Sequence, residues 1–166
     1  YVANGSEHDG YGDTTHLPSR HIQMTERRFS KLGLLEDGTF ESQNRGCSIA
    51  LMPWGGSKGS ALEAYDMLES LDATKGKLGW YYTMYLNPLP PELLEELKGK
   101  DLVLVPELNY QGQLSSVLRS LGVNAQSIIQ YTGLPFKSID LVDRVTEILD
   151  DIKSGKGKSE KTKVGK

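Results

Sequence analysis

The sequence predicts an α/β domain of three layers, built on a mostly parallel sheet. Short apolar runs alternate with amphipathic segments over residues 46–152, and turns containing glycine or proline separate them. Strands that alternate with helices in this way form parallel strands joined by crossover connections. A segment of this length is long enough to bury one hydrophobic core.

The elements of this domain follow in order along the chain. Strands are indicated by apolar runs, which are rich in aromatic and β-branched residues in several cases, and helices by apolar residues at helical spacing. The strands are expected at 47–53, 78–86, 102–105 and 127–131, and the helices at 57–71, 92–98, 112–121 and 138–152.

The flanking segments differ in composition from this domain. Residues 1–45 are expected to end a preceding domain, with a glycine-rich loop, an amphipathic connecting helix over 18–32 and a second loop over 33–45. Because the chain opens on Tyr1 and no leader pattern follows, we expect a piece of a longer polypeptide.

The end of the chain is strongly basic. Residues 153–166 hold six lysines and one glutamate, and so polar a segment is expected to be a disordered tail. Since it has no aromatic residues to stack on bases, a solvated end is favoured over a nucleic-acid or lipid contact.

Composition excludes several classes of protein. No apolar run approaches the roughly 20 residues of a membrane helix, so no membrane partner is expected. The single cysteine, Cys47, cannot form an internal disulfide, a thiolate zinc site or an iron–sulfur cluster. A packed Cys47 in a reducing, cytoplasmic setting is therefore the expectation.

The first candidate site follows the first expected strand. Gly55, Ser57 and Gly59 match the spacing of a hydrolase nucleophile elbow, but all three histidines precede the serine, which is the wrong order for that fold. The segment also lacks the Gly-Lys-Ser/Thr ending of a phosphate-binding loop. Two interpretations remain: an anion site at a helix start, or a tight turn with Ser57 as the helix cap, which is favoured.

A second candidate follows the third expected strand. Glu107 comes directly after the apolar run, and Asn109, Gln111 and Gln113 surround it. This carboxylate could bind a ligand or accept backbone N–H bonds, and Asn109 could cap the following helix. The structural role is favoured because a helix start stabilises negative charge, and Glu107 is expected to be largely buried.

Two further segments carry weaker signals. Glu7, His8 and Asp9 could hold a metal or act as acid and base, but the other histidines are not at a recognisable ligand spacing. A hydrogen-bonded loop is therefore favoured. The turn at 131–136 is expected to be structural, with Phe136 packed.

Taken together, these motifs resemble a known family. Five segments come in the order found in 2-oxoacid:ferredoxin oxidoreductases, and the chain resembles the carboxyl-terminal part of the alpha subunit of the 2-oxoglutarate enzyme. The segments are Glu7-His8-Asp9, the helix with Met24-Thr25-Glu26-Arg27-Arg28 and Lys31, the turn at 54–59, the stretch at 86–90, and Glu107 to Leu114 with Asn109, Gly112 and Gln113.

The resemblance implies a fold and a reaction. Residues 46–152 would form a transketolase carboxyl-terminal-like domain. The whole enzyme would decarboxylate a 2-oxoacid on thiamine diphosphate with magnesium, pass electrons through an iron–sulfur cluster to ferredoxin, and transfer the acyl group to coenzyme A. In this family the diphosphate-binding residues and cluster cysteines lie on the partner beta subunit.

The resemblance therefore implies a scaffold or interface role without a catalytic residue in this segment. Two alternatives stay open: a freestanding module that binds a small anion at residues 55–57, and the equivalent domain of another thiamine enzyme, such as a transketolase or a 2-oxoacid dehydrogenase beta chain. The residues expected to give structural support or subunit contact are Glu7, His8, Gly55, Ser57, Glu107, Asn109 and Gln113.

Overall fold

The computed structural model describes residues 5–35 and 39–155. The chain divides into two compact units. One unit takes in Tyr1–Thr39 and Tyr85–Pro91, and the other Phe40–Met84 with the remainder of the chain. Each unit is described by itself.

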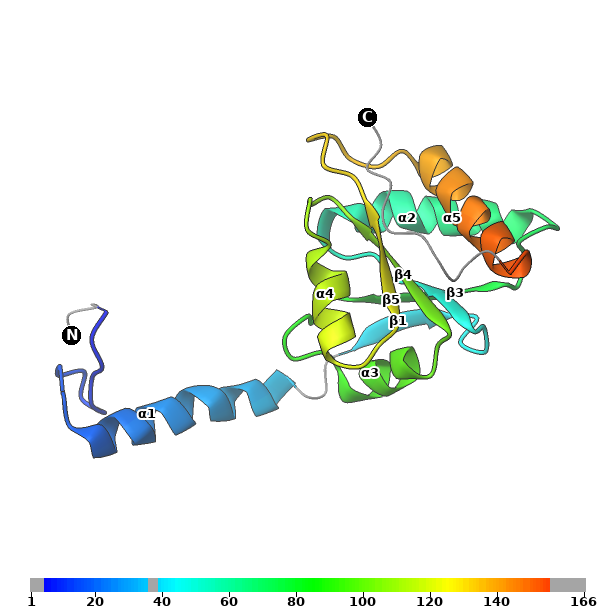
Figure 1. Ribbon diagram of the computed structural model, residues 1–166. Helices are drawn as coiled ribbons and strands as arrows, with labels where there is room; N and C mark the ends of the chain where they lie inside the picture. Colours follow the sequence, from blue (N-terminus) through cyan, green and yellow to red (C-terminus); the bar gives the residue numbers. More distant parts are fainter. Residues whose placement is uncertain (1–4, 36–38, 156–166) are drawn as a thin grey trace. The chain divides into compact units, whose positions relative to one another are not determined.

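The larger unit is built on one five-stranded sheet (Figure 1). The strand order is β1-β3-β2-β4-β5, and every neighbouring pair is parallel except β1 with β3. The predicted α/β class with a mostly parallel sheet is therefore confirmed. The strands are β1 (Phe40–Gln43), β2 (Ile49–Leu51), β3 (Leu78–Thr83), β4 (Leu102–Glu107) and β5 (Ala125–Ile129).

The edge strand β1 corrects the predicted loop over 33–45. It pairs antiparallel with β3, with Phe40 opposite Thr83 and Gln43 opposite Trp80. The strand is short and mostly polar, so it carries no apolar run of its own, and its pairing comes from tertiary contact. The Phe40 ring also stacks on Tyr81, with centroids 6.5 Å apart. The sheet thus begins before the predicted boundary at Gly46.

Four helices cover the two faces of this sheet. Figure 1 shows α2 and α5 together over one face and α3 over the other. Because parallel crossovers are right-handed, α4, which connects β4 to β5, lies on the same face as α3. The helices are α2 (Lys58–Ser70), preceded by the short 3-10 helix η2 (Gly55–Ser57), α3 (Pro91–Lys98), α4 (Gln113–Ser120) and α5 (Ser138–Lys153).

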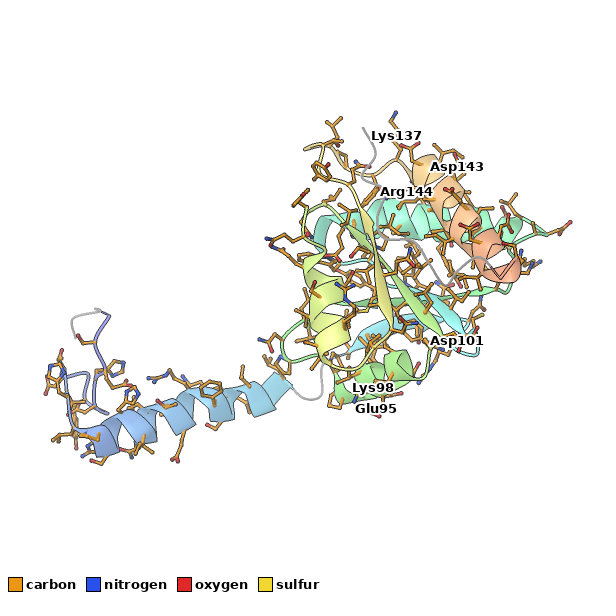
Figure 2. All side chains as sticks on the ribbon, viewed as in Figure 1. Glu95, Lys98, Asp101, Lys137, Asp143 and Arg144 are labelled. Atoms are coloured by element: carbon orange, nitrogen blue, oxygen red, sulfur yellow. The ribbon has the colours of Figure 1, made fainter. Side chains whose placement is uncertain are left out.

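The main hydrophobic core lies between the sheet and the α2–α5 layer. Successive strand residues point to opposite faces, and Trp80 from β3 packs against Tyr65 from α2 with ring centroids 5.6 Å apart. Phe136 is buried in the same cluster, as predicted. Figure 2 labels Arg144 on α5, whose Nη2 donates to the Ile129 carbonyl oxygen, 3.1 Å away, and so joins the helix to the end of β5.

The smaller unit contains a loop and the connecting helix. Helix α1 (Pro18–Ser30) continues into a 3-10 helix, η1 (Lys31–Leu35), which agrees with the helix predicted over 18–32. Proline at the first helical position needs no N–H partner there. The buried residue of α1 is Met24, whereas Ile22 and Phe29 are exposed.

The last helix ends one residue later than predicted. Lys153 is the last residue of α5 and not the first of a tail. The remainder of the predicted basic tail, from residue 156 on, lies outside the described residues. Within the described part of the chain, none of the helices is both long enough and apolar enough to span a membrane.

Candidate functional site

The Glu107 carboxylate lies at the end of β4 and is fully buried. Its Oε2 accepts the Leu114 N–H at 2.8 Å, and its Oε1 accepts the Ser115 N–H at 3.0 Å. These are backbone donors in the first turn of α4, where the helix has no internal acceptors for them. The prediction that Glu107 is buried and bonded to the next helix start is confirmed, although β4 includes Glu107 and does not stop at Val105.

The loop between β4 and α4 supplies the other acceptor for this helix. Asn109 Oδ1 accepts the N–H groups of Gly112 and Gln113 at 2.8 and 3.2 Å, so Asn109 serves the helix start as predicted. The helix itself begins at Gln113, one residue later than expected. Gly112 precedes it with a left-handed φ of 64°, and a Cβ there would lie 2.3 Å from Ser127 Oγ. Only glycine fits this position without rearrangement.

Two serines that the sequence did not single out complete the network. Ser115 Oγ donates to Glu107 Oε1, and Ser127 Oγ on β5 lies 2.7 Å from Ser115 Oγ. Burial raises the pKa of Glu107, but the hydrogen bonds from Ser115, Asn109 and Leu114 outweigh it, so this pKa lies below the ordinary value. The carboxylate is therefore ionised at neutral pH, and its oxygens are engaged by the protein itself.

The turn after β2 uses Ser57 differently from the prediction. Ser57 makes no side-chain capping bond to α2, so the expected cap is wrong. Its Oγ accepts the Trp54 N–H at 3.2 Å and lies 2.8 Å from the Trp54 carbonyl and 3.1 Å from the Pro106 carbonyl. The buried hydroxyl thus joins the turn to the end of β4, and Gly55 provides the left-handed φ of 53° that the turn needs.

The cation of this turn, Lys58, also has partners within the unit. Lys58 Nζ pairs with Glu41 Oε1 at 2.6 Å and lies 4.1 Å from the centroid of the Tyr82 ring. A helix start attracts anions most strongly when a free cation stands beside it. Here the charge is matched by a carboxylate from the edge strand.

In the smaller unit, Glu7 anchors the loop to α1. Its Oε1 and Oε2 accept hydrogen bonds from Arg28 Nη1 and Nη2 at 2.9 and 3.0 Å. His21 Nδ1 lies 3.0 Å from Oε2. The hydrogen bonds and charge of Arg28 hold the pKa of Glu7 below its usual range. A bidentate pair of this kind fixes orientation as well as distance.

Asp9 and His8 shape the loop itself. Asp9 Oδ1 accepts the N–H groups of Tyr11 and Asp13 at 2.8 and 3.1 Å, which lowers the pKa of Asp9. His8 Nδ1 lies 2.9 Å from the Asp9 carbonyl oxygen. The structure thus agrees with the predicted hydrogen-bonded loop. Among the described residues, no group of three or more His, Cys, Asp or Glu side chains could hold a metal ion.

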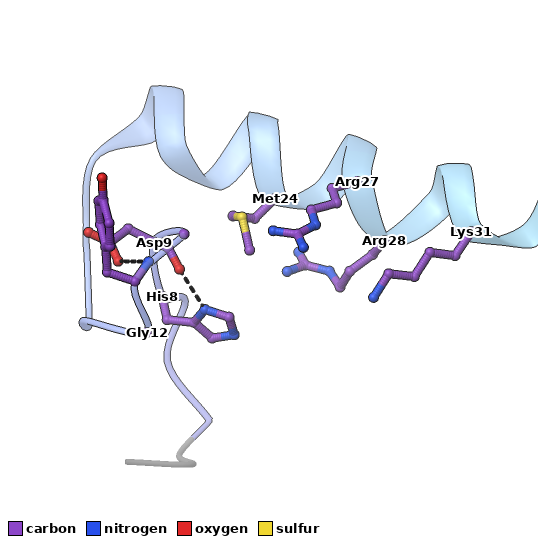
Figure 3. A pocket seen from close by; sticks show the side chains of 9 residues that line it. His8, Asp9, Gly12, Met24, Arg27, Arg28 and Lys31 are labelled. Carbon is purple, nitrogen blue, oxygen red and sulfur yellow. Dashed lines mark hydrogen bonds between the residues drawn. The ribbon is translucent and has the colours of Figure 1, made fainter. Parts of the chain in front are cut away.

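A hollow of about 490 Å³ separates this loop from α1. Figure 3 shows Met24, Arg27, Arg28 and Lys31 reaching from the helix toward the loop. These four residues follow the helical spacing i, i+3, i+4 and i+7, which places them on one face. In the sequence these residues belong to the family pattern, and their helical spacing is the signal that could have identified a site.

The larger unit is thus a three-layer α/β domain in which Ser57, Glu107 and Asn109, at or after the ends of strands β2 and β4, bond to backbone groups of the same unit. No family model matches the chain. The 2-oxoacid:ferredoxin oxidoreductase 2 subunit alpha of Aeropyrum pernix is 30% identical over 158 residues, which cover 90% of this chain and 24% of that protein. The 2-oxoglutarate oxidoreductase subunit KorA of Mycobacterium tuberculosis is 32% identical over 138 residues, covering 81% of this chain and 20% of that protein.

A solved structure agrees with these relatives. The 2-oxoglutarate:ferredoxin oxidoreductase from Magnetococcus marinus, with 2-oxoglutarate, coenzyme A and succinyl-CoA bound, matches with a TM-score of 0.68 and 30% identity over 89% of this chain and 26% of that chain. The chain is therefore a homologue of 2-oxoacid:ferredoxin oxidoreductase alpha subunits, and it spans about a quarter of the length of the first of these relatives. The resemblance and the α/β fold class are both confirmed, and the structural match is consistent with a transketolase carboxyl-terminal-like domain.

Proposed function

We propose that this chain is part of the alpha subunit of a thiamine-diphosphate-dependent 2-oxoacid:ferredoxin oxidoreductase, with 2-oxoglutarate as the oxoacid. The enzyme would convert the oxoacid and coenzyme A into an acyl-CoA and carbon dioxide, and ferredoxin would take the electrons. The observation that carries this proposal is the match of about nine-tenths of the chain to alpha subunits, in sequence and in structure.

Within that enzyme, the part described here would serve as scaffold and interface. Support comes from the carboxyl ends of β2 and β4. There the side chains of Glu107, Asn109 and Ser57 are hydrogen-bonded to backbone groups of their own unit. A group that accepts several internal hydrogen bonds is held in place and has little capacity left for a substrate. We assign no catalytic step to any of these residues.

The cofactors of the whole enzyme do not fit the residues described here. An iron–sulfur cluster needs several cysteine ligands, whereas the chain has Cys47 alone. The described residues also offer no set of three metal-binding side chains for magnesium. We therefore assign the thiamine diphosphate, its magnesium ion and the cluster to other parts of the enzyme.

The proposed partner of this scaffold is the beta subunit, with ferredoxin reached through the whole enzyme. Exposed apolar side chains stand on the loops that follow β4 and β5. Tyr110 and Tyr131 pack edge to face with centroids 5.1 Å apart while remaining 67% and 49% exposed, and Leu134 is 68% exposed. Clustered exposed aromatic residues are typical of protein interfaces.

A chimeric enzyme tests the proposal. In the Mycobacterium tuberculosis KorA protein, the matching segment would be replaced by this chain, and the chimera would be produced with the other subunits of that enzyme. We expect an assembled complex that reduces a viologen dye in the presence of 2-oxoglutarate and coenzyme A. An assembled complex without this activity would overturn the assignment to the alpha subunit.

The isolated chain provides the second arm of the test. Supplied with 2-oxoglutarate, coenzyme A, thiamine diphosphate and the dye, it is expected to give no turnover above a protein-free blank. Turnover by the chain alone would overturn the scaffold role and leave the family assignment intact.

A further inference from the structure

We propose that the hollow between the loop at residues 7–12 and helix α1 is a binding site for a phosphate-bearing small molecule, with Arg27 and Lys31 as the groups that hold the phosphate. This site goes beyond the scaffold role and does not depend on it. All of its residues belong to the smaller unit.

The charges around the hollow are not balanced. Four side chains of α1 and the adjoining η1 line it, and three of them are cations. Arg28 is engaged by both oxygens of Glu7. Among the residues that the structure describes, the side chains of Arg27 and Lys31 have no hydrogen-bond or ion-pair partner, although they stand one turn apart on the same face. Like charges at this spacing repel each other.

Two unpaired cations favour a phosphate over a single carboxylate. A phosphate monoester carries a charge of about −1.5 to −2 at neutral pH, which matches both side chains together. The planar Arg27 guanidinium can bind two phosphate oxygens, while the Lys31 ammonium acts as a point charge beside it. The one carboxylate on the lining, Asp9, directs Oδ1 to the N–H groups of Tyr11 and Asp13 and stays within its loop.

The size of the hollow points to a molecule larger than phosphate itself. Its volume of about 490 Å³ lies within the range of small-molecule sites. Beside the cations, Met24 and the Tyr11 ring offer apolar surface, and Gly10 and Gly12 keep the loop side free of long side chains. An organic group attached to the phosphate would contact these residues.

The opposing walls of the site are held in place before any ligand binds. The Glu7–Arg28 pair ties the loop to the helix, and Asp9 accepts two backbone N–H bonds within the loop. Preorganised walls reduce the ordering cost of binding.

A titration of the whole 166-residue chain by nuclear magnetic resonance tests this inference. The probe is inorganic pyrophosphate at low salt, and the readouts are the backbone amides of Gly10, Tyr11 and Gly12 and the Arg27 Nε–H. We expect saturable shifts of these signals with a dissociation constant of about 1 mM or less. That value corresponds to a weak, specific site for a fragment of the ligand.

Two matched double variants separate this site from general charge attraction. Arg27→Gln with Lys31→Gln is expected to weaken pyrophosphate binding at least fivefold. Lys75→Gln with Lys137→Gln removes the same charge from exposed positions of the larger unit and is expected to leave binding unchanged. Both variants should retain the spectrum of the folded chain, because they alter exposed side chains.

Three results would overturn the proposal. The first is the absence of saturable shifts in the unmodified chain. The second is an equal loss of binding in the two double variants, which would show a response to net charge. The third is equally tight binding of citrate, which would show that the site does not select phosphate.

Discussion

Replacing the buried Glu107 by alanine is expected to cost about 2–4 kcal/mol of unfolding free energy. The change removes the acceptor of two backbone donors in the first turn of α4, the N–H groups of Leu114 and Ser115. Each buried donor left without an acceptor costs about 1–3 kcal/mol. A water molecule that enters the vacated space would recover part of the combined cost of the two donors. Urea unfolding followed by tryptophan fluorescence measures the difference.

The control for this experiment is an exposed carboxylate on the same unit. Glu147→Ala on α5 is expected to change stability by less than about 0.5 kcal/mol, because its side chain is exposed. A cost for Glu107→Ala as small as that of the control would refute the reasoning, since it would mean that the two N–H groups do not depend on the carboxylate.

The same carboxylate predicts a dependence on pH. The folded pKa of Glu107 is lowered, whereas an unfolded glutamate titrates near 4.3. The free energy of unfolding that the ionised carboxylate contributes is therefore fully present above about pH 4.3. It is lost as the pH falls through the folded pKa. Glu107→Gln cannot titrate at this position. The difference in unfolding free energy between this variant and the unmodified chain should therefore narrow as the pH is lowered from about 5 to 3. A gap that widens over this range would contradict the assignment.

Three further changes test other parts of the larger unit. Gly112→Ala should cost more than about 2 kcal/mol, because its Cβ would meet Ser127 Oγ, whereas Gly122→Ala, also left-handed but in open space, should cost about 1 kcal/mol in urea unfolding. Phe136→Ala should lower the free energy of unfolding by about 3–5 kcal/mol because it leaves a cavity. A smaller loss by the same measurement would show that neighbouring side chains move in to fill that cavity. Burial raises the pKa of Tyr65 to about 12, so the stability of the unmodified chain should fall as the pH rises from about 10 toward that value, and Tyr65→Phe should flatten this slope.

The sequence predicted the parallel part of the fold because each of its elements carries a local signal. The strand β2 and residues 102–105 of β4 are continuous apolar runs, which is typical of strands buried on both faces. Helix α5 repeats apolar residues at helical spacing, and its buried positions Leu141, Val145 and Leu149 follow that period. Glu107 could be predicted as buried because a strand precedes it and a helix start follows.

The parts that were missed depend on contacts between distant segments. Strand β1 is short and largely polar, so only its pairing with β3 makes it a strand. Ser127 joins the Glu107 network from a different strand, and nothing in its neighbouring residues indicates that role. Ser57 looked like a helix cap, but its hydroxyl bonds the Trp54 backbone and the Pro106 carbonyl oxygen, 49 positions away along the chain.

The arrangement at the carboxyl ends of the strands bears on where ligands can bind. In open parallel sheets the carboxyl ends of the strands are the usual ligand site, because helix starts and strand ends present unpaired polar groups there. Here the start of α4 is satisfied by Glu107 in the position that a ligand anion would take, and Lys58 beside α2 is paired with Glu41. The Glu107 carboxylate and the Lys58 ammonium are therefore both paired within the unit. By contrast, the side chains of Arg27 on α1 and Lys31 at the start of η1 line a hollow and have no partners among the described residues. If both proposals hold, the α/β unit would provide the framework and the smaller unit would bind the ligand.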